Sequence, residues 1–248
     1  MKLIKVEHIG GRELTYRVDG KAFKIKKGET AIMPVGIYNN NRDRLAKIRS
    51  EEKNKQSARY NHVERIIGEL KPKIVIEIGI LRALTAKRMI RAMLSYMDKP
   101  LYIGFDLFEP SPEAEGSKKG VESLRLVRWR LSKLEGARVR LIKGDTNYTL
   151  PAYNGPKAGF IFIDGGHSLD TIKNDFVWSA RWLKEGGIIL MDDYYSDKIP
   201  CNQFIGCKTL VDSLKSPWKY EILEPADVIP RDGSKINMVK IWRAGDES

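Results

Sequence analysis

The chain has 248 residues, of which 42% are hydrophobic and 9% aromatic, a composition typical of a globular protein with one full core and a small appendage. Its formal net charge of +12 favours anionic substrates or polyanionic partners, so nucleic-acid binding is kept as an alternative. No apolar stretch approaches the ~20 residues of a membrane span, and the first residues lack a signal-peptide core, which predicts a cytoplasmic protein without a membrane partner.

Residues 1–35 are expected to form a separate small segment. The runs 14–18 and 22–25 have strand character and are separated by Asp19-Gly20, which predicts a β-hairpin. Residues 30–33 add a third short strand. We therefore predict a β meander, too small to be stable alone, that is a structural appendage or contacts substrate or another subunit of a homo-oligomer.

Residues 36–58 are polar and highly charged, which predicts a solvated helix or a linker. The main domain is expected over residues 59–248. It begins with a helix over residues 60–70, in which Val63, Ile66 and Ile67 lie on one apolar stripe.

From residue 74 onward, apolar strands alternate with helices. The expected strands are 74–79, 100–106, 139–145, 159–164 and 188–193, and the expected helices are 83–97, 121–134 and 168–183. This alternation predicts an α/β fold with a doubly wound, mostly parallel sheet. Two closing strands, 218–224 and 236–243, are expected to be antiparallel at one edge of the sheet.

Five successive strands end in a carboxylate, at Glu77, Asp106, Asp145, Asp164 and Asp192. In an open α/β sheet the ligands bind outside the carboxyl ends of the strands. Five acids at one edge repel one another unless they bind cationic or hydroxyl-rich groups. This edge is therefore the predicted functional site.

Two cysteines, Cys201 and Cys207, are too few for a disulfide framework or a zinc site. We expect free thiols, and a bond between the two stays open.

Residues 74–223 resemble a class I S-adenosylmethionine-dependent methyltransferase, in the branch similar to metal-dependent O-methyltransferases. The motif E-x-G-x-x-x-G-x-S/T stands at 77–85, with Ala83 in place of the second glycine. The motif D-G-x-H stands at 164–167, and G-G-x-x-x-x-D-D begins at Gly186. The resemblance implies a Rossmann-like methyltransferase fold that binds S-adenosylmethionine.

The resemblance also implies roles at the sheet edge. Gly79 would admit the amino-acid end of the cofactor while Glu77 steers the loop, and Asp106 would accept the ribose hydroxyls. Asp145 and the amide of Thr146 would meet the adenine, although Asp145 as a loop cap for Asn147 stays open. The implied cofactor-binding residues are Glu77, Gly79, Ala83, Thr85, Asp106, Leu107, Asp145, Thr146 and Asp164.

In the metal-dependent branch, acids at the places of Asp164, Asp192 and Asp193 hold Mg²⁺ or a similar ion. Such an ion would orient the acceptor hydroxyl and lower its pKa. His167 and Asp164 are the implied catalytic residues, with His167 taking the proton of the acceptor. The alternative is that Asp192 and Asp193 cap the following segment and Asp164 orients His167.

The sequence thus predicts a methyltransferase that acts on an oxygen of a small hydroxylated molecule or a sugar, with a divalent metal. One alternative is an RNA methyltransferase or nucleic-acid-binding protein that uses its basic surface, and another is a non-catalytic cofactor-binding scaffold. The sequence lacks the N/D-P-P-Y motif of base-amine methylases and the G-x-G-x-x-G fingerprint of dehydrogenases.

Overall fold

The computed structural model describes residues 3–8, 13–18, 21–34, 45–47, 57–108, 122–197, 205–229 and 232–245. It divides into two units, one of Met1–Lys55 with Glu122–Arg130 and the other of Gln56–Val121 with Leu131–Ser248. Of the predicted linker over 36–58, only residues 45–47 and 57–58 are described. The division at residues 35 and 58 therefore stays a prediction.

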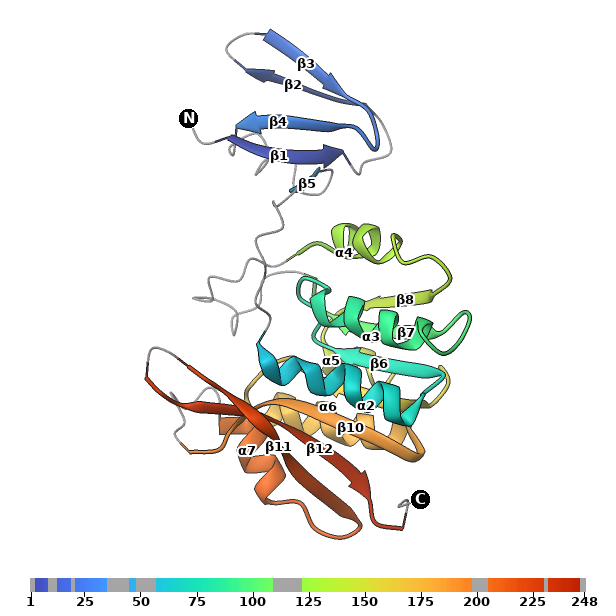
Figure 1. Cartoon of the computed structure of the whole chain (residues 1–248), viewed down its shortest axis with the longest axis vertical. Coiled ribbons are helices and arrows are strands. Elements are labelled where there is room, and N and C mark those ends of the chain that lie inside the picture. Colours follow the sequence, from blue (N-terminus) through green and yellow to red (C-terminus); the bar gives the residue numbers. More distant parts are fainter. Residues whose placement is uncertain are drawn as a thin grey trace. The chain divides into compact units, whose positions relative to one another are not determined.

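The first unit contains two small antiparallel sheets (Figure 1). Strands β2 and β3 form the predicted hairpin, in which Leu14 lies opposite Ile25 and the ring of Tyr16 stacks on Phe23. The second sheet has the order β4-β1-β5, so the third predicted strand pairs with the N-terminal strand instead of extending the hairpin. The elements of this unit are β1 (Leu3–His8), β2 (Leu14–Val18), β3 (Lys21–Ile25), β4 (Thr30–Pro34), β5 (Leu45–Lys47) and α4 (Leu124–Leu131).

The second unit is built on a seven-stranded sheet with the order β11-β12-β10-β9-β6-β7-β8. Strands β6 to β10 are parallel to one another, and β11 and β12 are antiparallel at one edge. This confirms the predicted α/β fold and its closing pair. The strands are β6 (Ile74–Ile78), β7 (Leu101–Asp106), β8 (Arg138–Lys143), β9 (Ala158–Ile163), β10 (Leu183–Tyr195), β11 (Trp218–Val228) and β12 (Lys235–Arg243).

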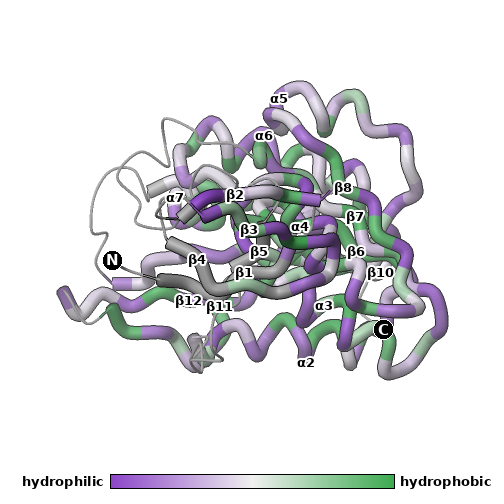
Figure 2. Tube along the Cα trace, turned by 90° about the horizontal axis from the view of Figure 1, so that it is seen from above, coloured by the Kyte–Doolittle hydropathy of each residue, from purple (hydrophilic) through white to green (hydrophobic). Residues whose placement is uncertain are grey.

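Helices cover both faces of this sheet. Figure 2 shows α2 and α3 on one side of the strands and α5 and α6 on the other. Val63, Ile66 and Ile67 of α2 are fully buried, as their helical spacing predicted, and the core of the sheet is rich in isoleucine and phenylalanine. The helices are η1 (Ala58–Tyr60), α2 (Asn61–Leu70), α3 (Leu84–Leu94), α5 (Thr146–Thr149), α6 (Leu169–Trp182) and α7 (Ile205–Asp212).

The strand order reverses direction next to β6. The chain runs from β6 outward to β7 and β8, and then returns to β9 on the other side of β6. The loops after β6 and β9 therefore leave the sheet in opposite directions, which is the switch point where doubly wound sheets bind their ligands. The acids predicted to form the site follow these strands.

The described helices include none that is both long enough and apolar enough to cross a membrane. Cys207 on α7 is buried and carries a free thiol, whose pKa is raised by burial. Cys201 lies outside the described residues.

Candidate functional site

The loop between β6 and α3 has left-handed backbone at three positions, Gly79 (φ 88°), Leu81 (φ 47°) and Ala83 (φ 59°). Gly79 requires glycine because a Cβ there would lie 2.1 Å from the backbone oxygen of Asp164. Ala83 is fully buried and is the N-cap residue of α3. The positive φ of Ala83 favours glycine, which is the residue at this place in the methyltransferase motif that residues 77–85 resemble. The loop therefore passes directly over the end of β9 at the switch point.

Asp106, at the end of β7, holds this loop in shape. Its Oδ2 accepts hydrogen bonds from the backbone amides of Ile80 (2.7 Å) and Leu81 (3.0 Å), and its Oδ1 accepts one from Phe108 (2.7 Å). A carboxylate has about four lone-pair sites. The three amides therefore leave about one acceptor site on Asp106, where the sequence predicted two hydrogen bonds from ribose hydroxyls. Next to it, Leu107 is half-buried.

Glu77 lies inside the protein, with 1% of its surface exposed. Its carboxyl group accepts a hydrogen bond from the hydroxyl of Tyr102 on β7. Burial raises the pKa of Glu77 well above its ordinary value, which favours the neutral carboxyl group. We expected Glu77 to steer the loop, but its bond is to Tyr102, a residue that the sequence marked only as part of a buried strand.

Two further predicted cofactor residues lie after β8, and a third lies in the first turn of α3. Asp145 is exposed and is the N-cap of α5, where its Oδ1 accepts a hydrogen bond from the amide of Asn147 at 2.8 Å. This is the cap that the sequence left open as the alternative. Thr146 is the first residue of α5 and is half-buried, and Thr85 is buried in the first turn of α3.

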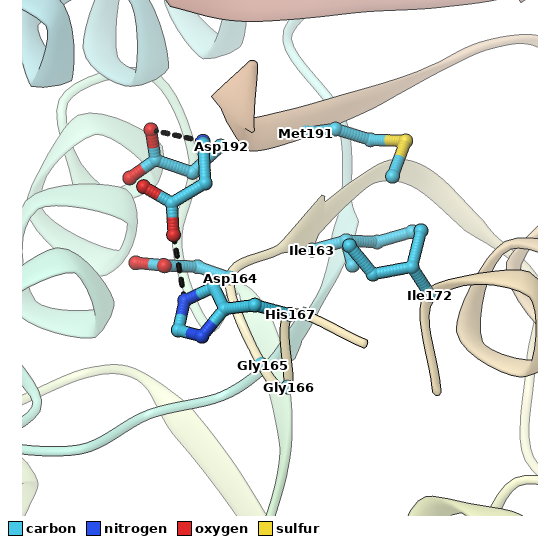
Figure 3. Close-up of a pocket in the computed structure, with 9 residues that line it drawn as sticks. Ile163, Asp164, Gly165, Gly166, His167, Ile172, Met191 and Asp192 are labelled. Carbon is cyan, nitrogen blue, oxygen red and sulfur yellow. Dashed lines mark hydrogen bonds and ion pairs between the residues drawn. The ribbon is translucent and has the colours of Figure 1, made fainter. Parts of the chain in front are cut away.

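The acids at the ends of β9 and β10 converge on one small hollow (Figure 3). The pairing of β10 with β12 shifts by a bulge between Met191 and Tyr194, within which Asp193 has φ 61°. Bulges of this kind redirect side chains near functional sites. Asp164, Asp192, Asp193 and His167 all line the hollow, so the structure brings the predicted metal ligands and the predicted base together.

His167 pairs with Asp193. Its Nε2 lies 2.6 Å from Oδ2 of Asp193, and about a third of the His167 side chain is exposed. The sequence had placed His167 beside Asp164 as its partner. The bulge in β10 turns Asp193 toward the histidine and so supplies a different carboxylate.

Arg59, which the sequence analysis did not single out, binds Asp192 of β10. Its Nε lies 2.7 Å from Oδ1 of Asp192, and its Nη2 lies 3.0 Å from Oδ2 of the same residue. Its Nη1 donates to Asp227 on β11 at 2.6 Å and to Ser57 at 3.1 Å. Burial alone would lower the pKa of Arg59, but Asp192 raises it above its usual value, so the guanidinium stays charged.

Tyr60 bridges two of the acids. Its hydroxyl lies 2.7 Å from Oδ2 of Asp192 and 3.1 Å from Oδ2 of Asp164. Burial and repulsion from Asp192 and Asp193 raise the pKa of Asp164 well above its usual value. The Tyr60 hydroxyl thus lies between the two carboxyl groups and links them.

These contacts decide whether the acids fit a divalent ion. Oδ1 of Asp192 accepts from Arg59 and from the amide of Asp193 at 2.9 Å, and Oδ2 accepts from Arg59 and Tyr60. All four lone-pair sites of this carboxylate are used. Within the described ranges, no three His, Cys, Asp or Glu side chains are grouped so as to hold a metal. The predicted ligands are together, but as arranged they do not fit Mg²⁺.

No signal in the sequence linked Arg59 and Tyr60 to this site. They form the single turn of η1 before α2, and Arg59 is 133 residues from Asp192. Neither hydrophobic periodicity nor motif spacing reports a pairing over that distance.

Known proteins match the part of the chain that forms this site. Residues 76–194 match the family model described as a methyltransferase domain. Cofactor-bound Rv0187 from MTB superposes with a TM-score of 0.55 at 17% identity, covering 80% of this chain and 84% of that one. The O-methyltransferase from Bacillus cereus in complex with SAH gives a TM-score of 0.53 at 14% identity, covering 73% of this chain and 79% of that one.

An rRNA methylase from Streptococcus thermophilus gives a TM-score of 0.53 at 12% identity, covering 76% of this chain and 98% of that one. At these identities the similar structures establish the fold, and the family match identifies the domain. Residues 76–194 therefore carry a methyltransferase domain, in the fold of the class I S-adenosylmethionine-dependent methyltransferases.

Proposed function

We propose that this protein transfers the methyl group of S-adenosylmethionine to an oxygen atom of a small hydroxylated molecule or a sugar. The observation that carries the proposal is the pairing of His167 Nε2 with Asp193 Oδ2 at 2.6 Å, at the same sheet edge as the glycine loop after β6. The pair supplies a base at the carboxyl edge of the sheet, next to the switch point at which doubly wound sheets bind their ligands.

The cofactor would lie across the loop after β6 and the end of β7. Gly79 lets the loop lie directly against the backbone of Asp164, and Asp106 keeps the amides of Ile80 and Leu81 in place. The remaining lone pair of Asp106 is proposed to accept one ribose hydroxyl. Leu107, Asp145 and Thr146 would border the adenine, and Ala83 and Thr85 shape the start of α3.

The histidine pair accounts for the proton of the acceptor. When Nε2–H of His167 donates to Asp193, the neutral ring carries its lone pair on Nδ1, which takes the acceptor proton. S-adenosylmethionine, when bound, supplies an electrophilic methyl group on a sulfonium. As the C–S bond breaks and the C–O bond forms, His167 holds the proton and Asp193 stabilises the imidazolium.

The predicted assistance by Mg²⁺ has no place in this sequence of steps. Asp192 is bound by Arg59 on both oxygens, and Asp164 contacts Tyr60. We therefore assign the chemistry to His167 and Asp193 alone.

The test is transfer of a tritiated methyl group from S-adenosylmethionine to a panel of a catechol, a simple phenol and a monosaccharide. We expect labelled methyl ether from at least one oxygen acceptor, and His167→Ala should lower kcat by about 100-fold or more. Binding of S-adenosylhomocysteine to the variant, measured by calorimetry, should be unchanged. Cofactor binding without transfer to any acceptor would contradict the proposal and favour the non-catalytic scaffold.

The charge distribution favours one second candidate, methylation of RNA. Residues 1–55 contain 14 lysines and arginines against 7 aspartates and glutamates, so this segment carries much of the excess positive charge. An RNA ligand predicts affinity that falls steeply between 50 and 200 mM salt. Labelled methyl groups on RNA, with none on the small acceptors, would replace the first proposal with this one.

A further inference from the structure

Arg59 lies where the resemblance to metal-dependent enzymes implied a cation. Only 12% of its side chain is exposed. Its guanidinium faces three acids, with Asp192 at 2.7 Å, Asp227 at 2.6 Å and Asp193 at 3.8 Å. A planar fork that binds a carboxylate through two parallel bonds is the strongest arrangement that a side-chain cation makes.

A divalent ion cannot share Asp192 with this guanidinium. Mg²⁺ needs an oxygen lone pair directed at it from about 2.1 Å in an octahedral shell. Each oxygen of Asp192 already accepts two hydrogen bonds. An ion that took Asp192 would leave Arg59 buried without its main partner, which is strongly unfavourable.

Tyr60 strengthens this arrangement from the adjacent position. Its hydroxyl links Asp192 to Asp164, and its ring packs edge-on against Phe162 of β9. The Arg59 guanidinium lies 5.0 Å from the centre of the Tyr60 ring. One turn, η1, therefore places both a positive charge and a hydrogen-bond donor over the acids.

We propose that Arg59 is an internal cation that replaces a divalent ion at Asp164, Asp192 and Asp193, so that this methyltransferase site holds no metal. The inference deepens the proposed function and rests on it for the purpose of the site, but its test measures metal binding alone. The acids then serve to position Arg59 and Tyr60, and the acceptor is deprotonated by His167 without a metal.

The experiment is titration of the 248-residue chain with Mn²⁺, a substitute for Mg²⁺ whose free concentration is read by electron paramagnetic resonance. Asp192→Asn should bind Mn²⁺ no more weakly than the wild-type chain, because Asp192 is not a ligand in the wild type. Arg59→Gln should bind one Mn²⁺ per chain at least tenfold more tightly than wild type, because the freed acids can then act as ligands. Adding Asp192→Asn to that variant should abolish the gain.

The matched control is Arg65→Gln on α2, which removes an exposed arginine that pairs with Glu69 one turn later. It should bind Mn²⁺ as wild type does. Asp192-dependent Mn²⁺ binding by the wild-type chain would overturn the proposal, and so would a folded Arg59→Gln variant without any gain.

If Arg59→Gln does not fold, the comparison of wild type with Asp192→Asn decides alone. Calorimetric binding of S-adenosylhomocysteine in EDTA, measured on the same wild-type sample, separates the two proposals. Its absence would count against the proposed function and leave the Mn²⁺ result as it stands.

Discussion

The hydroxyl of Tyr102 on β7 donates a hydrogen bond to the buried carboxyl group of Glu77 on β6. The two side chains meet across Gly104, which is the residue paired with Glu77 in the sheet. A Cβ on Gly104 would lie 2.8 Å from the Tyr102 oxygen, so the missing side chain provides the space for the bond. Glu77 is thereby held in the sheet, where burial favours its neutral form.

This relationship predicts a pH dependence of stability. Because burial raises the pKa of Glu77 above its usual 4.5, the folded chain keeps a proton that the unfolded chain loses above that pH. The stabilising contribution is therefore complete below pH 4.5 and falls as pH rises toward the folded pKa, by at most about 1.4 kcal/mol per unit. Glu77→Gln stays neutral, so its stability relative to wild type should increase from pH 5 to pH 8, as measured by urea unfolding.

The control for this prediction is Glu69→Gln, which changes an exposed glutamate on α2. It should follow the wild-type pH dependence. Parallel curves for wild type and Glu77→Gln would show that the buried carboxyl group does not retain its proton.

Gly79→Ala should destabilise the domain more than a glycine substitution at similar φ in open space. Gly186 has φ 69° and nothing within 4 Å of its Cβ position, whereas a Cβ on Gly79, at φ 88°, would lie 2.1 Å from the Asp164 oxygen. Gly186→Ala should cost about 1–2 kcal/mol for the left-handed backbone alone. Gly79→Ala adds a backbone clash, so its urea midpoint should be the lower of the two. Equal urea midpoints for the two variants would contradict the close approach of the Gly79 loop to the backbone of Asp164.

Asp106→Ala should weaken binding of S-adenosylhomocysteine by about tenfold or more, equivalent to 1.4 kcal/mol. The substitution frees the amides of Ile80 and Leu81 and removes the proposed ribose acceptor at the same time. Calorimetric titration measures the affinity, and Asp98→Ala, an exposed acid after α3, serves as the control. Unchanged affinity in Asp106→Ala would remove Asp106 from the cofactor site.

Tyr60→Phe should lower the free energy of unfolding by about 1–3 kcal/mol, because it removes the hydroxyl that links the buried carboxyl groups of Asp164 and Asp192. Tyr148→Phe is the control, since 76% of Tyr148 is exposed and its hydroxyl remains in water. Urea unfolding at pH 7 compares the two. A Tyr60→Phe chain as stable as the control would show that the bridge contributes nothing to stability.

The sheet was predictable because its strands are short, continuous apolar runs separated by amphipathic helices. The acids at the strand ends were predictable for the same reason, since parallel strands bring their carboxyl ends to one edge. The pairing of β2 with β3 was predictable from the turn dipeptide Asp19-Gly20 in the sequence between them. These signals are local, and each is complete within about fifteen residues of the chain.

The partners of the acids were not predictable, because each pairing joins distant segments or depends on a local irregularity. Tyr102 belongs to the apolar run of its strand, and only the pairing of Gly104 with Glu77 in the sheet brings its hydroxyl to the Glu77 carboxyl group. The bulge that turns Asp193 to His167 has no sequence marker. The pairing of β4 with β1 likewise lacks a turn signal between the two strands.

The large sequence separation between Arg59 and its acidic partners has a consequence for biosynthesis. Its partners Asp192 and Asp227 follow it by 133 and 168 residues. Contacts of such separation form late in folding, because the intervening chain must first be ordered. A ribosome must translate residue 227 before this arginine can meet its last acid, so a truncated product that lacks β11 would lack an intact site.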